Sequence, residues 1–311
     1  MKVSCVLATC GRPKLLAQQL RSILLQSRLP NEIIISEDLP NKESKNLLNE
    51  LEFGDIEVHY LENFTKLGMV QNFNRALSAS TGDLIFLCDD DDIWLENKIE
   101  FMVNAMLANQ DIVICYHNVE FFDSKLGLWG LSKFKNYNRL GIPIKEFIMG
   151  SASCFRSFIL KDILPIPDFE VGHDNWVAFV AKCHGAFQHH DIVLQHYRRH
   201  NLNMSVIAEN RPSVFILSTL FRYIKILGPS YRHKMLAQNE TNKKRLACIK
   251  KRAPNLKNIN VIERTIIEEG QRLHTQCLPH LKRFPIIISN IFKGFYKDKP
   301  LRSIIRDFIT L

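Results

Sequence analysis

The sequence predicts an α/β protein in which a doubly wound, mainly parallel sheet flanked by helices precedes a C-terminal all-helical region. Over residues 1–122, short runs rich in Val, Ile and Leu alternate with helical patterns of about 10–15 residues. This alternation is typical of right-handed βαβ units. From Pro212 onward only helical patterns appear, and the net charge changes sign near residue 210.

The elements of the first 122 residues are predicted from hydrophobic spacing. The run Ile33-Ile34-Ile35 is the centre of a buried strand. Leu16, Leu20 and Ile23 recur at helical spacing behind Pro13, which suits a first helical turn. The expected strands are residues 2–8, 32–36, 55–60, 83–88 and 111–122, and the expected helices are residues 13–26, 41–51, 68–80 and 94–109.

Beyond residue 122 the pattern is mixed. We expect a loop over residues 124–145, a short strand over 152–156, a helix over 173–185 and a last strand over 192–198. The helical patterns that follow are broken at each remaining proline or Gly-Pro pair, namely Gly228-Pro229, Pro254, Pro279, Pro285 and Pro300.

The charge distribution predicts two domains. Residues 1–210 carry 20 Lys and Arg against 26 Asp and Glu, a net charge of −6, whereas residues 211–311 carry 21 against 6, a net charge of +15. A shift this sharp favours a boundary near residue 210. We therefore expect a ligand-binding domain over residues 1–210 and a basic helical region over residues 211–311.

Composition excludes several classes of protein. No stretch of about 18 or more uninterrupted apolar residues occurs, so a membrane-spanning helix is not expected. The apolar run at the start lacks the basic leader and the cleavage site of a signal peptide. Eight scattered cysteines form no C-x-x-C pair, which favours a reduced, cytoplasmic setting over a disulfide framework or a zinc knuckle.

Four consecutive carboxylates follow the strand predicted over residues 83–88. In open α/β sheets, ligands bind beyond the carboxyl ends of the strands. Asp89 through Asp92 repel one another, and a hard divalent cation with oxygen ligands resolves that repulsion while bridging to phosphates. If the chain stays extended, Asp89 and Asp91 face one side and Asp90 and Asp92 the other, with one pair capping the next helix. A solvated acidic turn or a helix cap is the alternative interpretation.

Four segments in this order resemble the GT-A-fold glycosyltransferases of family 2. Residues 86–94, Phe-Leu-Cys-Asp-Asp-Asp-Asp-Ile-Trp, resemble the family's D-x-D signature. Residues 6–13 resemble its first strand and nucleotide-binding turn, and residues 33–38 the acidic end of its second strand. Residues 63–74, with Gly68 and Asn72, resemble the segment that leads into its third helix. The resemblance spans about residues 1–205.

The resemblance implies a nucleotide-sugar site and a divalent metal, Mn²⁺ or Mg²⁺. It places Glu37 at the base, Asp89 at the ribose or metal, and Asp91 on the metal that bridges the donor diphosphate. Where the family commonly has Asp-Asp-Gly-Ser, this chain has Glu37-Asp38-Leu39-Pro40, which leaves the identity of the base open. The residues expected to bind the nucleotide sugar are Thr9, Arg12, Glu37, Asn72, Asp89, Asp90, Arg198 and Arg199. Strand-end polar residues, turns and caps remain the alternative for Thr9, Glu37 and Asn72.

Transfer with inversion needs a carboxylate that takes the proton from the acceptor hydroxyl. Asp174, in Gly172-His173-Asp174-Asn175-Trp176, opens a predicted helix and is our candidate. The resemblance implies the same, since a Glu-Asp or His-Asp pair supplies the base in family 2, and His-Asp before an aromatic residue is similar to the rhamnosyltransferase-like branch. A helix cap is the alternative role, and Asp168 and Glu170 are nearby substitutes.

The segment Tyr197-Arg198-Arg199-His200-Asn201-Leu202-Asn203 resembles the Tyr-Arg-x-His-x-x-Asn run that closes the site in this branch. Arginine holds a diphosphate through paired donors, and a neutral imidazole can complete a metal site. We expect His200 to be a third metal ligand beside Asp91 and Asp89, with Arg198 or Arg199 on the diphosphate. Surface charge at a strand end is the alternative.

The basic C-terminal region mixes cations with aromatic and aliphatic residues, especially over residues 281–297. This composition favours a helix on an anionic membrane surface, where a lipid-linked acceptor would lie. A solvated basic face over a small helical core, or a homo-oligomer through these helices, is the alternative. Nucleic acid is not an expected partner, because no recognised nucleic-acid motif is present.

Together these observations predict an inverting, metal-dependent glycosyltransferase. It would move a sugar from a nucleoside-diphosphate sugar to a hydroxyl of a glycan or lipid-linked acceptor, in cell-surface polysaccharide synthesis and in the cytoplasm, peripheral on the inner face of the membrane. The alternatives are a nucleotide-sugar-binding protein without catalysis and a metal-dependent nucleotidyltransferase. Against the last, Thr9-Cys10-Gly11-Arg12-Pro13 has a single glycine, whereas such enzymes open with a Gly-rich phosphate loop.

Overall fold

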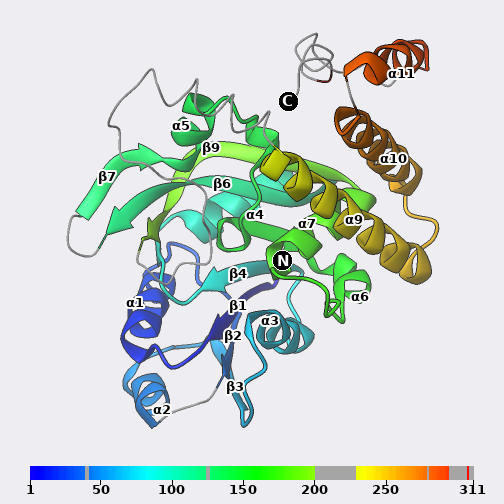
Figure 1. Cartoon of the computed structure of the whole chain (residues 1–311). Helices are drawn as coiled ribbons and strands as arrows, with labels where there is room; N and C mark the ends of the chain where they lie inside the picture. The colour runs from blue at the N-terminus through cyan, green and yellow to red at the C-terminus, as the bar shows by residue number, and fades with distance from the viewer. Residues whose placement is uncertain (39–41, 124–126, 200–228, 279, 294–306, 308–311) are drawn as a thin grey trace. The chain divides into compact units, whose positions relative to one another are not determined.

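The computed structural model describes residues 1–38, 42–123, 127–199, 229–278, 280–293 and 307 (Figure 1). The chain divides into two compact units, Met1–Glu209 and Asn210–Leu311. The first unit holds a nine-stranded sheet with helices around it.

Four parallel strands form one half of the sheet. In spatial order they are β3 (Glu57–Asn63), β2 (Glu32–Asp38), β1 (Val3–Thr9) and β4 (Leu84–Asp89). The connections contain α1 (Pro13–Leu24), α2 (Lys42–Glu50) and α3 (Met69–Ser78), as the sequence predicts. Because the strands are parallel, their carboxyl ends share one edge of the sheet.

Helices cover both faces of this half, which explains the apolar runs of its inner strands β1, β2 and β4, whereas β3 at the edge mixes polar and apolar residues. Successive residues of β1 point to opposite faces. Leu7 belongs to a buried cluster that includes Leu16 and Leu20 of α1. Val6 is equally buried and points to the other face, where α3 contacts β1 and β2.

The other half of the sheet is mixed. Strand β8 (Ser153–Arg156) runs antiparallel between β4 and β6 (Ile112–Asp123), and β6 pairs in parallel with β9 (Ala186–Arg198). Strand β5 (Ile93–Trp94) lies antiparallel to β9 at the edge. The doubly wound sheet flanked by helices is confirmed, with its continuous parallel part confined to β3-β2-β1-β4.

The loop expected over residues 124–145 is wrong. It contains β7 (Gly127–Ser132), which pairs with β6, followed by α5 (Lys133–Arg139) and the short 3₁₀ turn η1 (Ile144–Glu146). Gly127 and Gly130, both with positive φ, interrupt the strand pattern that sequence reading depends on. Hydrogen-bonded pairing with the neighbouring β6 stabilises this strand although its own sequence has low strand propensity.

Two further boundaries differ from the prediction. The helix expected from residue 94 begins only at Lys98, as α4 (Lys98–Ala108), because Ile93 and Trp94 pair with β9 instead. Strand β9 begins at Ala186 rather than at residue 192 and continues through a histidine pair that pairs with β6. The remaining elements of the first unit are η2 (Gly150–Ala152), η3 (Ser157–Ile159), α6 (Leu160–Ile163) and α7 (His173–His184).

The described part of the second unit contains α9 (Pro229–Arg252), α10 (Ile259–Gln276) and α11 (His280–Phe292). The break expected at Pro285 is wrong, since this proline lies inside α11. A buried ion pair joins Arg272 of α10 to Asp307, with Nε 2.8 Å from Oδ2. None of the described helices combines the length and the apolar composition needed to cross a bilayer.

Candidate active site

The acidic run lies at the carboxyl edge of the parallel half, as expected. Asp89 ends β4, and Asp90 and Asp91 form a turn directly after it. The prediction that the four side chains alternate between two sides is therefore wrong, because alternation requires an extended chain. The predicted capping role is also wrong, since α4 starts later, at Lys98, with no side-chain cap on it.

Arg12 is the residue that counters the charge of this turn. Its guanidinium lies against two of the carboxylates, with Nη2 2.5 Å from Asp90 Oδ1 and Nη1 3.2 Å from Asp91 Oδ2. Burial alone would lower its pKa, but the carboxylates of Asp90, Asp91 and Asp89 outweigh burial and raise the pKa of Arg12. The predicted nucleotide-binding turn and the acidic run are thus joined directly.

Thr9 and Asn72 connect the acidic turn, residues 89–92, to β1 and α3. Thr9 Oγ1 donates to Asp90 Oδ2 at 2.6 Å. Asn72 Nδ2 donates to the Thr9 carbonyl at 3.0 Å, and Asn72 Oδ1 accepts from Asn63 Nδ2 at 2.8 Å. All four side chains are buried. Both predicted residues therefore lie within one hydrogen-bonded cluster at this edge.

Burial and the neighbouring carboxylates disfavour the charged forms of Asp89 and Asp90, so added positive charge would stabilise them. Burial, together with the charge of Asp91, raises the pKa of Asp89 to about 7. Burial also raises the pKa of Asp90 to about 6, although Arg12 and Thr9 act against it. A divalent cation would supply this charge, and carboxylate oxygens are the hard ligands that Mg²⁺ and Mn²⁺ prefer. The donor set of the turn fits such an ion.

Asp92 is held apart from its neighbours. Its Oδ2 accepts from Ser151 Oγ at 3.0 Å and from Gln195 Nε2, while its Oδ1 accepts from the backbone N–H of Arg198 at 3.1 Å. Burial, with the charges of Asp91 and Asp89, raises its pKa well above the ordinary value. Asp92 therefore ties the turn to η2 and β9 rather than facing a ligand.

Lys98 is a buried cation that the sequence reading missed. Its Nζ donates to the Ser151 carbonyl at 2.6 Å and to Gln195 Oε1 at 2.7 Å, and it lies 3.7 Å from the centre of the Trp94 ring. Burial lowers the pKa of this ammonium to about 7. The signal was a lysine at i, i+4 spacing with the buried Met102 of the same helix.

Glu37 is fully buried at the end of β2. Its Oε1 accepts from the Gly11 N–H and from Ser44 Oγ, each at 3.0 Å, and its Oε2 accepts from Tyr60 at 2.9 Å. Gly11 takes a φ of 61°, which favours glycine, so the turn after β1 can present its N–H to this carboxylate. A nucleobase that hydrogen-bonds to Glu37 would have to share the carboxylate with these donors.

Asp38, which the sequence reading left without a role, shapes the loop before α3. Its Oδ2 accepts from the Gly68 N–H at 2.7 Å and its Oδ1 from the Leu67 N–H at 2.9 Å. Asp38 follows Glu37 in the same strand, and the two carboxylates bind different segments. Glu37 accepts from the turn after β1, and Asp38 accepts from the loop before α3.

The structure describes two of the three residues expected to close the site. Arg198 is buried, and its Nε donates to the Asp91 carbonyl at 2.7 Å and its Nη2 to Gln18 at 2.6 Å. Arg199 is half-buried, with its guanidinium 5.8 Å from the Tyr197 ring centre. His200, the expected third metal ligand, lies outside the described residues.

Asp174 lies in the first turn of α7, close to the acidic turn. A side chain at Gly150 would come within 3.4 Å of Asp174 Cβ, and the next residue, Ser151, donates to Asp92. The charge of Asp174 is also among the causes that raise the pKa of Asp89. Asp174 Oδ1 accepts from the backbone N–H of Asn175 at 2.8 Å. The candidate base and the acidic turn thus share one neighbourhood.

The residues around Asp174 are packed closely. His173 stacks on Phe73 with ring centres 3.6 Å apart, and burial lowers its pKa to about 4, so it is neutral at pH 7. Of the two substitutes for Asp174, Glu170 is buried, and Asp168 is exposed and accepts from Gln71 at 2.8 Å.

Comparison with known proteins identifies the family. Residues 4–164 match the family described as Glycosyl transferase family 2. The chain belongs to this family. The solved structures of Staphylococcus aureus TarS resemble it over nearly the whole chain. TarS 1–349 in complex with UDP has a TM-score of 0.58 at 14% identity and covers 97% of this chain and 82% of that one.

The complex of TarS with UDP-GlcNAc gives a TM-score of 0.53 at 15% identity, over 99% of this chain and 89% of that one. At these identities the likeness concerns the fold. Together with the family match, it confirms the GT-A fold that the sequence resemblance implies.

Characterised relatives of this family 2 chain include two glucosyltransferases. UDP-Glc:alpha-D-GlcNAc-diphosphoundecaprenol beta-1,3-glucosyltransferase of Escherichia coli is 27% identical over 140 residues, 44% of this chain and 54% of that protein. GalNAc(5)-diNAcBac-PP-undecaprenol beta-1,3-glucosyltransferase of Campylobacter jejuni is 29% identical over 118 residues, 38% of each protein. These matches span about half of each relative's length or less.

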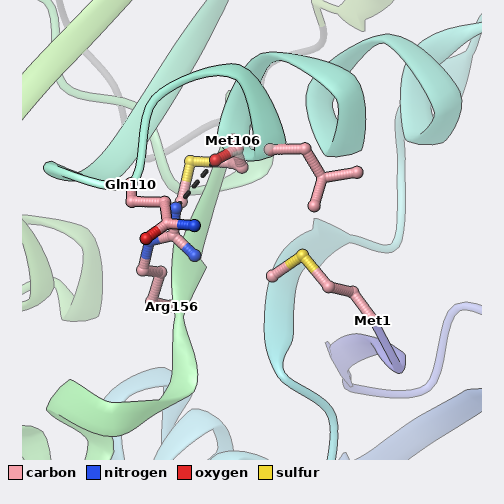
Figure 2. Close-up of a pocket in the computed structure, with 5 residues that line it drawn as sticks. Met1, Met106, Gln110 and Arg156 are labelled. Atoms are coloured by element: carbon pink, nitrogen blue, oxygen red, sulfur yellow. Dashed lines mark hydrogen bonds between the residues drawn. The ribbon is translucent and has the colours of Figure 1, made fainter.

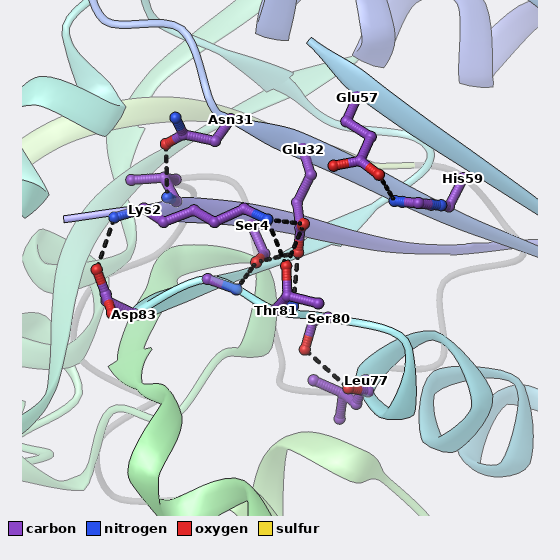
Figure 3. Close-up of polar contacts among 12 residues, drawn as sticks. Lys2, Ser4, Asn31, Glu32, Glu57, His59, Leu77, Ser80, Thr81 and Asp83 are labelled. Carbon is purple, nitrogen blue, oxygen red and sulfur yellow. Dashed lines mark hydrogen bonds and ion pairs between the residues drawn. The ribbon is translucent and has the colours of Figure 1, made fainter.

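Among the described residues of this family 2 chain, one group of three candidate metal ligands has its ligand atoms within 4.8 Å of one another, namely Glu32, Glu57 and His59. It lies at the amino ends of β2 and β3, away from the acidic turn. The buried Glu32 already accepts from Ser4 and Thr81 and pairs with Lys2 Nζ at 2.8 Å, as Figure 3 shows. Glu32 of this group therefore stabilises the amino end of the sheet through bonds to neighbouring segments.

A shallow hollow also lies at the amino end of the sheet (Figure 2). It is lined by Met1, Met106, Leu107, Gln110 and Arg156. Arg156 donates to backbone carbonyls, with Nε 2.8 Å from the Ile112 oxygen and Nη2 2.7 Å from the Met106 oxygen. The chemistry-bearing residues are at the opposite edge, so this hollow is not the donor site.

Proposed function

We propose that this chain is an inverting, metal-dependent glycosyltransferase. It moves a sugar from a nucleoside-diphosphate sugar to a hydroxyl of a glycan or lipid-linked acceptor. Membership of glycosyl transferase family 2 supports sugar transfer as the class of reaction.

The observation that carries the proposal is the meeting of two groups of carboxylates at one edge of the sheet. Asp174 lies beside Gly150 at the start of α7, and Ser151, the next residue of η2, donates to the acidic turn. An inverting transfer needs this pair: one carboxylate at the acceptor hydroxyl and a charged centre at the leaving diphosphate. The charge of Asp174 is among the causes that raise the pKa of Asp89.

The chain's residues divide the reaction between them. Asp89 and Asp91 would hold the cation, with Arg12 beside them. When bound, the cation supplies positive charge for the departing diphosphate. Asp174 takes the proton from the acceptor hydroxyl while the hydroxyl oxygen bonds to the anomeric carbon. The bond from that carbon to the diphosphate breaks in the same step. The configuration at the anomeric carbon is inverted, and Asp174 ends protonated.

Substitution of the base tests the proposal. Asp174→Asn keeps the shape of the side chain but cannot accept the proton, so the turnover number should fall about 100-fold or more. The affinity for a nucleotide sugar such as UDP-glucose should stay within about threefold, since the donor site is intact. Release of UDP in the presence of acceptor gives the rate, and calorimetry gives the affinity.

Asp168→Asn is the matched control, because Asp168 is exposed and lies six residues before the proposed base. It should keep near-normal turnover. Full turnover in Asp174→Asn would remove the proposed base, and loss in Asp168→Asn alone would transfer the role to that residue.

The class of acceptor rests on the relatives. Two of them are named for transfer to undecaprenol-diphosphate-linked sugars. A lipid-linked oligosaccharide is therefore the acceptor we propose, with cell-surface polysaccharide synthesis as its setting and a peripheral position on the inner face of the membrane. The rhamnosyltransferase-like branch remains a prediction from the His173-Asp174 pair and the residues after Tyr197.

The two alternatives make different predictions. A nucleotide-sugar-binding protein without catalysis would bind the donor but release no nucleoside diphosphate, so the wild-type turnover assay separates it from an enzyme. A nucleotidyltransferase would instead release pyrophosphate. The family match favours sugar transfer over both.

The assignment of roles to the two parts of the chain is likewise a proposal. We place donor binding and catalysis in residues 1–210. We assign residues 211–311 to contacts with a membrane surface or with a second copy through the C-terminal helices.

A further inference from the structure

Helix α11 presents two different faces. Arg283, Ile287 and Asn290 are spaced i, i+4, i+7 and are buried, so they form the face that packs within the second unit. Ile288, Ile291 and Phe292 are spaced i, i+3, i+4 and lie on another face. There the exposed fractions are 36% for Ile288, 39% for Ile291 and 86% for Phe292.

An exposed cluster of this kind needs an occupant. Scattered exposed apolar residues are ordinary, but neighbouring ones on a single helix face mark a surface that binds something apolar. Ile286, at 36% exposed, adds to the apolar character of the helix. Within the described part of the second unit, α11 packs through its buried face, and the second apolar face stays exposed.

The charge around this face identifies the occupant. Residues 270–297 contain no Asp or Glu but five Lys and Arg. Lys282 of α11 and Lys293, which directly follows the helix and donates its N–H to the Ser289 carbonyl at 2.9 Å, are both exposed. They lie eleven residues apart, close to three helical turns, so they project from the same side of the helix axis. Their long stems allow the ammonium groups to reach a charged plane beside the apolar face.

A second copy of the chain would bring the same acid-free, basic helix to the contact, so like charges would meet. An anionic bilayer brings the opposite charge together with an apolar interior. The described helices include none able to span a bilayer, so α11 would lie along the surface rather than cross it.

We propose that α11 docks on an anionic lipid surface, with Ile288, Ile291 and Phe292 at the acyl boundary and Lys282 and Lys293 against lipid phosphates. This contact is independent of Asp174 and of the acidic turn. It would hold the catalytic unit of the same chain near a lipid-linked acceptor, which is the point at which it adds to the proposed function.

Vesicle flotation of the full chain tests the proposal. Wild-type protein should float with phosphatidylcholine vesicles that contain phosphatidylglycerol and much less with phosphatidylcholine alone, and raised salt should weaken the binding. Ile288→Ser/Phe292→Ser should lower the partition coefficient about tenfold or more, since two apolar side chains no longer leave water. Lys282→Gln/Lys293→Gln should lower it only for the anionic vesicles.

Val261→Ser/Ile267→Ser is the matched control. These two residues are exposed apolar side chains on α10 of the same unit, 65% and 48% exposed. The control should bind vesicles like wild type. Equal thermal unfolding of all variants would show that the exposed positions do not affect folding.

Three results would overturn the proposal. The first is unchanged flotation of the α11 variants, and the second is equal binding to neutral and anionic vesicles. The third is a wild-type dimer in lipid-free buffer that the Ile288→Ser/Phe292→Ser change converts to monomer, since a second copy would then occupy this face. Because turnover on a soluble acceptor does not depend on α11, failure of docking and failure of the proposed function are distinguishable.

Discussion

Arg12 occupies the place where positive charge is most needed. Its guanidinium pairs with Asp90 and Asp91 at once, and its charge acts against the burial that raises the pKa of Asp90. A divalent cation on Asp91 would compete with Arg12 for the same carboxylate. Once displaced from Asp91, Arg12 would be free to contact a donor phosphate, the role that the sequence predicts for it.

This competition gives Arg12→Gln two effects of opposite sign. Affinity for Mn²⁺ alone should rise by about three- to tenfold, because a competing cation is removed. Affinity for UDP in the presence of Mn²⁺ should fall by about tenfold, because a phosphate contact is lost. Electron paramagnetic resonance of free Mn²⁺ measures the first and calorimetry the second.

Arg21→Gln is the control for this pair of measurements, since Arg21 is an exposed arginine of α1, the helix that begins directly after Arg12. It should change neither affinity. Unchanged or weaker Mn²⁺ binding in Arg12→Gln would contradict the competition.

At the residue scale, the sequence predicts which side chains gather but not their individual partners. Thr9, Asn72 and the acidic run meet because parallel strands end at one edge, and that follows from the βαβ pattern. The separate role of Asp92 depends on Ser151 and Gln195, which are distant in sequence. No local pattern in the chain records those contacts.

At the scale of elements, Glu32 joins three parts of the sheet. It accepts from Ser4 of β1 at 2.6 Å, from Thr81 in the turn before β4, and pairs with Lys2 (Figure 3). Burial would raise its pKa, but these donors outweigh burial and lower the pKa from 4.5 to about 2.

The shift makes stability depend on pH. Because the folded-state pKa is depressed, the carboxylate contributes stability that is fully present above pH 4.5 and is lost as the pH falls towards 2. Glu32→Gln should lower the free energy of unfolding by about 2 kcal/mol at pH 7. The difference from wild type should shrink as the pH falls from about 5 to about 2. Urea unfolding at each pH measures this difference.

Glu57→Gln is the control, since Glu57 belongs to the same group but is exposed. It should cost less than about 0.5 kcal/mol at any of these pH values. A difference between wild type and Glu32→Gln that stays constant with pH would contradict the role of the charge.

Element prediction succeeded where one helix or strand explains its own pattern and failed where a neighbour decides. The strands β1, β2 and β4 are predicted directly from apolar runs, because both of their faces are buried. In contrast, Ile93 and Trp94 continue the helical pattern but pair with β9, and β7 forms against β6 despite two glycines. Both errors come from pairing that local propensity does not contain.

At the scale of the whole molecule, the sheet's two halves supply different parts of the site. The parallel half brings Thr9, Glu37 and Asp89 to one edge. The mixed half brings η2, β9 and α7, and so Ser151, Gln195 and Asp174, to the same edge. The sequence predicts the first group from topology together with the family resemblance. Of the second group it predicts only Asp174; Ser151 and Gln195 are not predicted, because no periodic pattern links residue 92 to residue 151 or to residue 195.

We infer that the acidic turn holds a divalent cation, which in turn holds the donor's diphosphate. Calorimetric binding of UDP, with and without Mn²⁺, tests it most directly in wild type and Asp91→Asn, with Asp55→Asn, an exposed loop carboxylate, as control. Mn²⁺ should strengthen UDP binding at least about tenfold in wild type and the control but not in Asp91→Asn. Equal UDP affinity with and without Mn²⁺ in wild type, or an undiminished Mn²⁺ effect in Asp91→Asn, would contradict it.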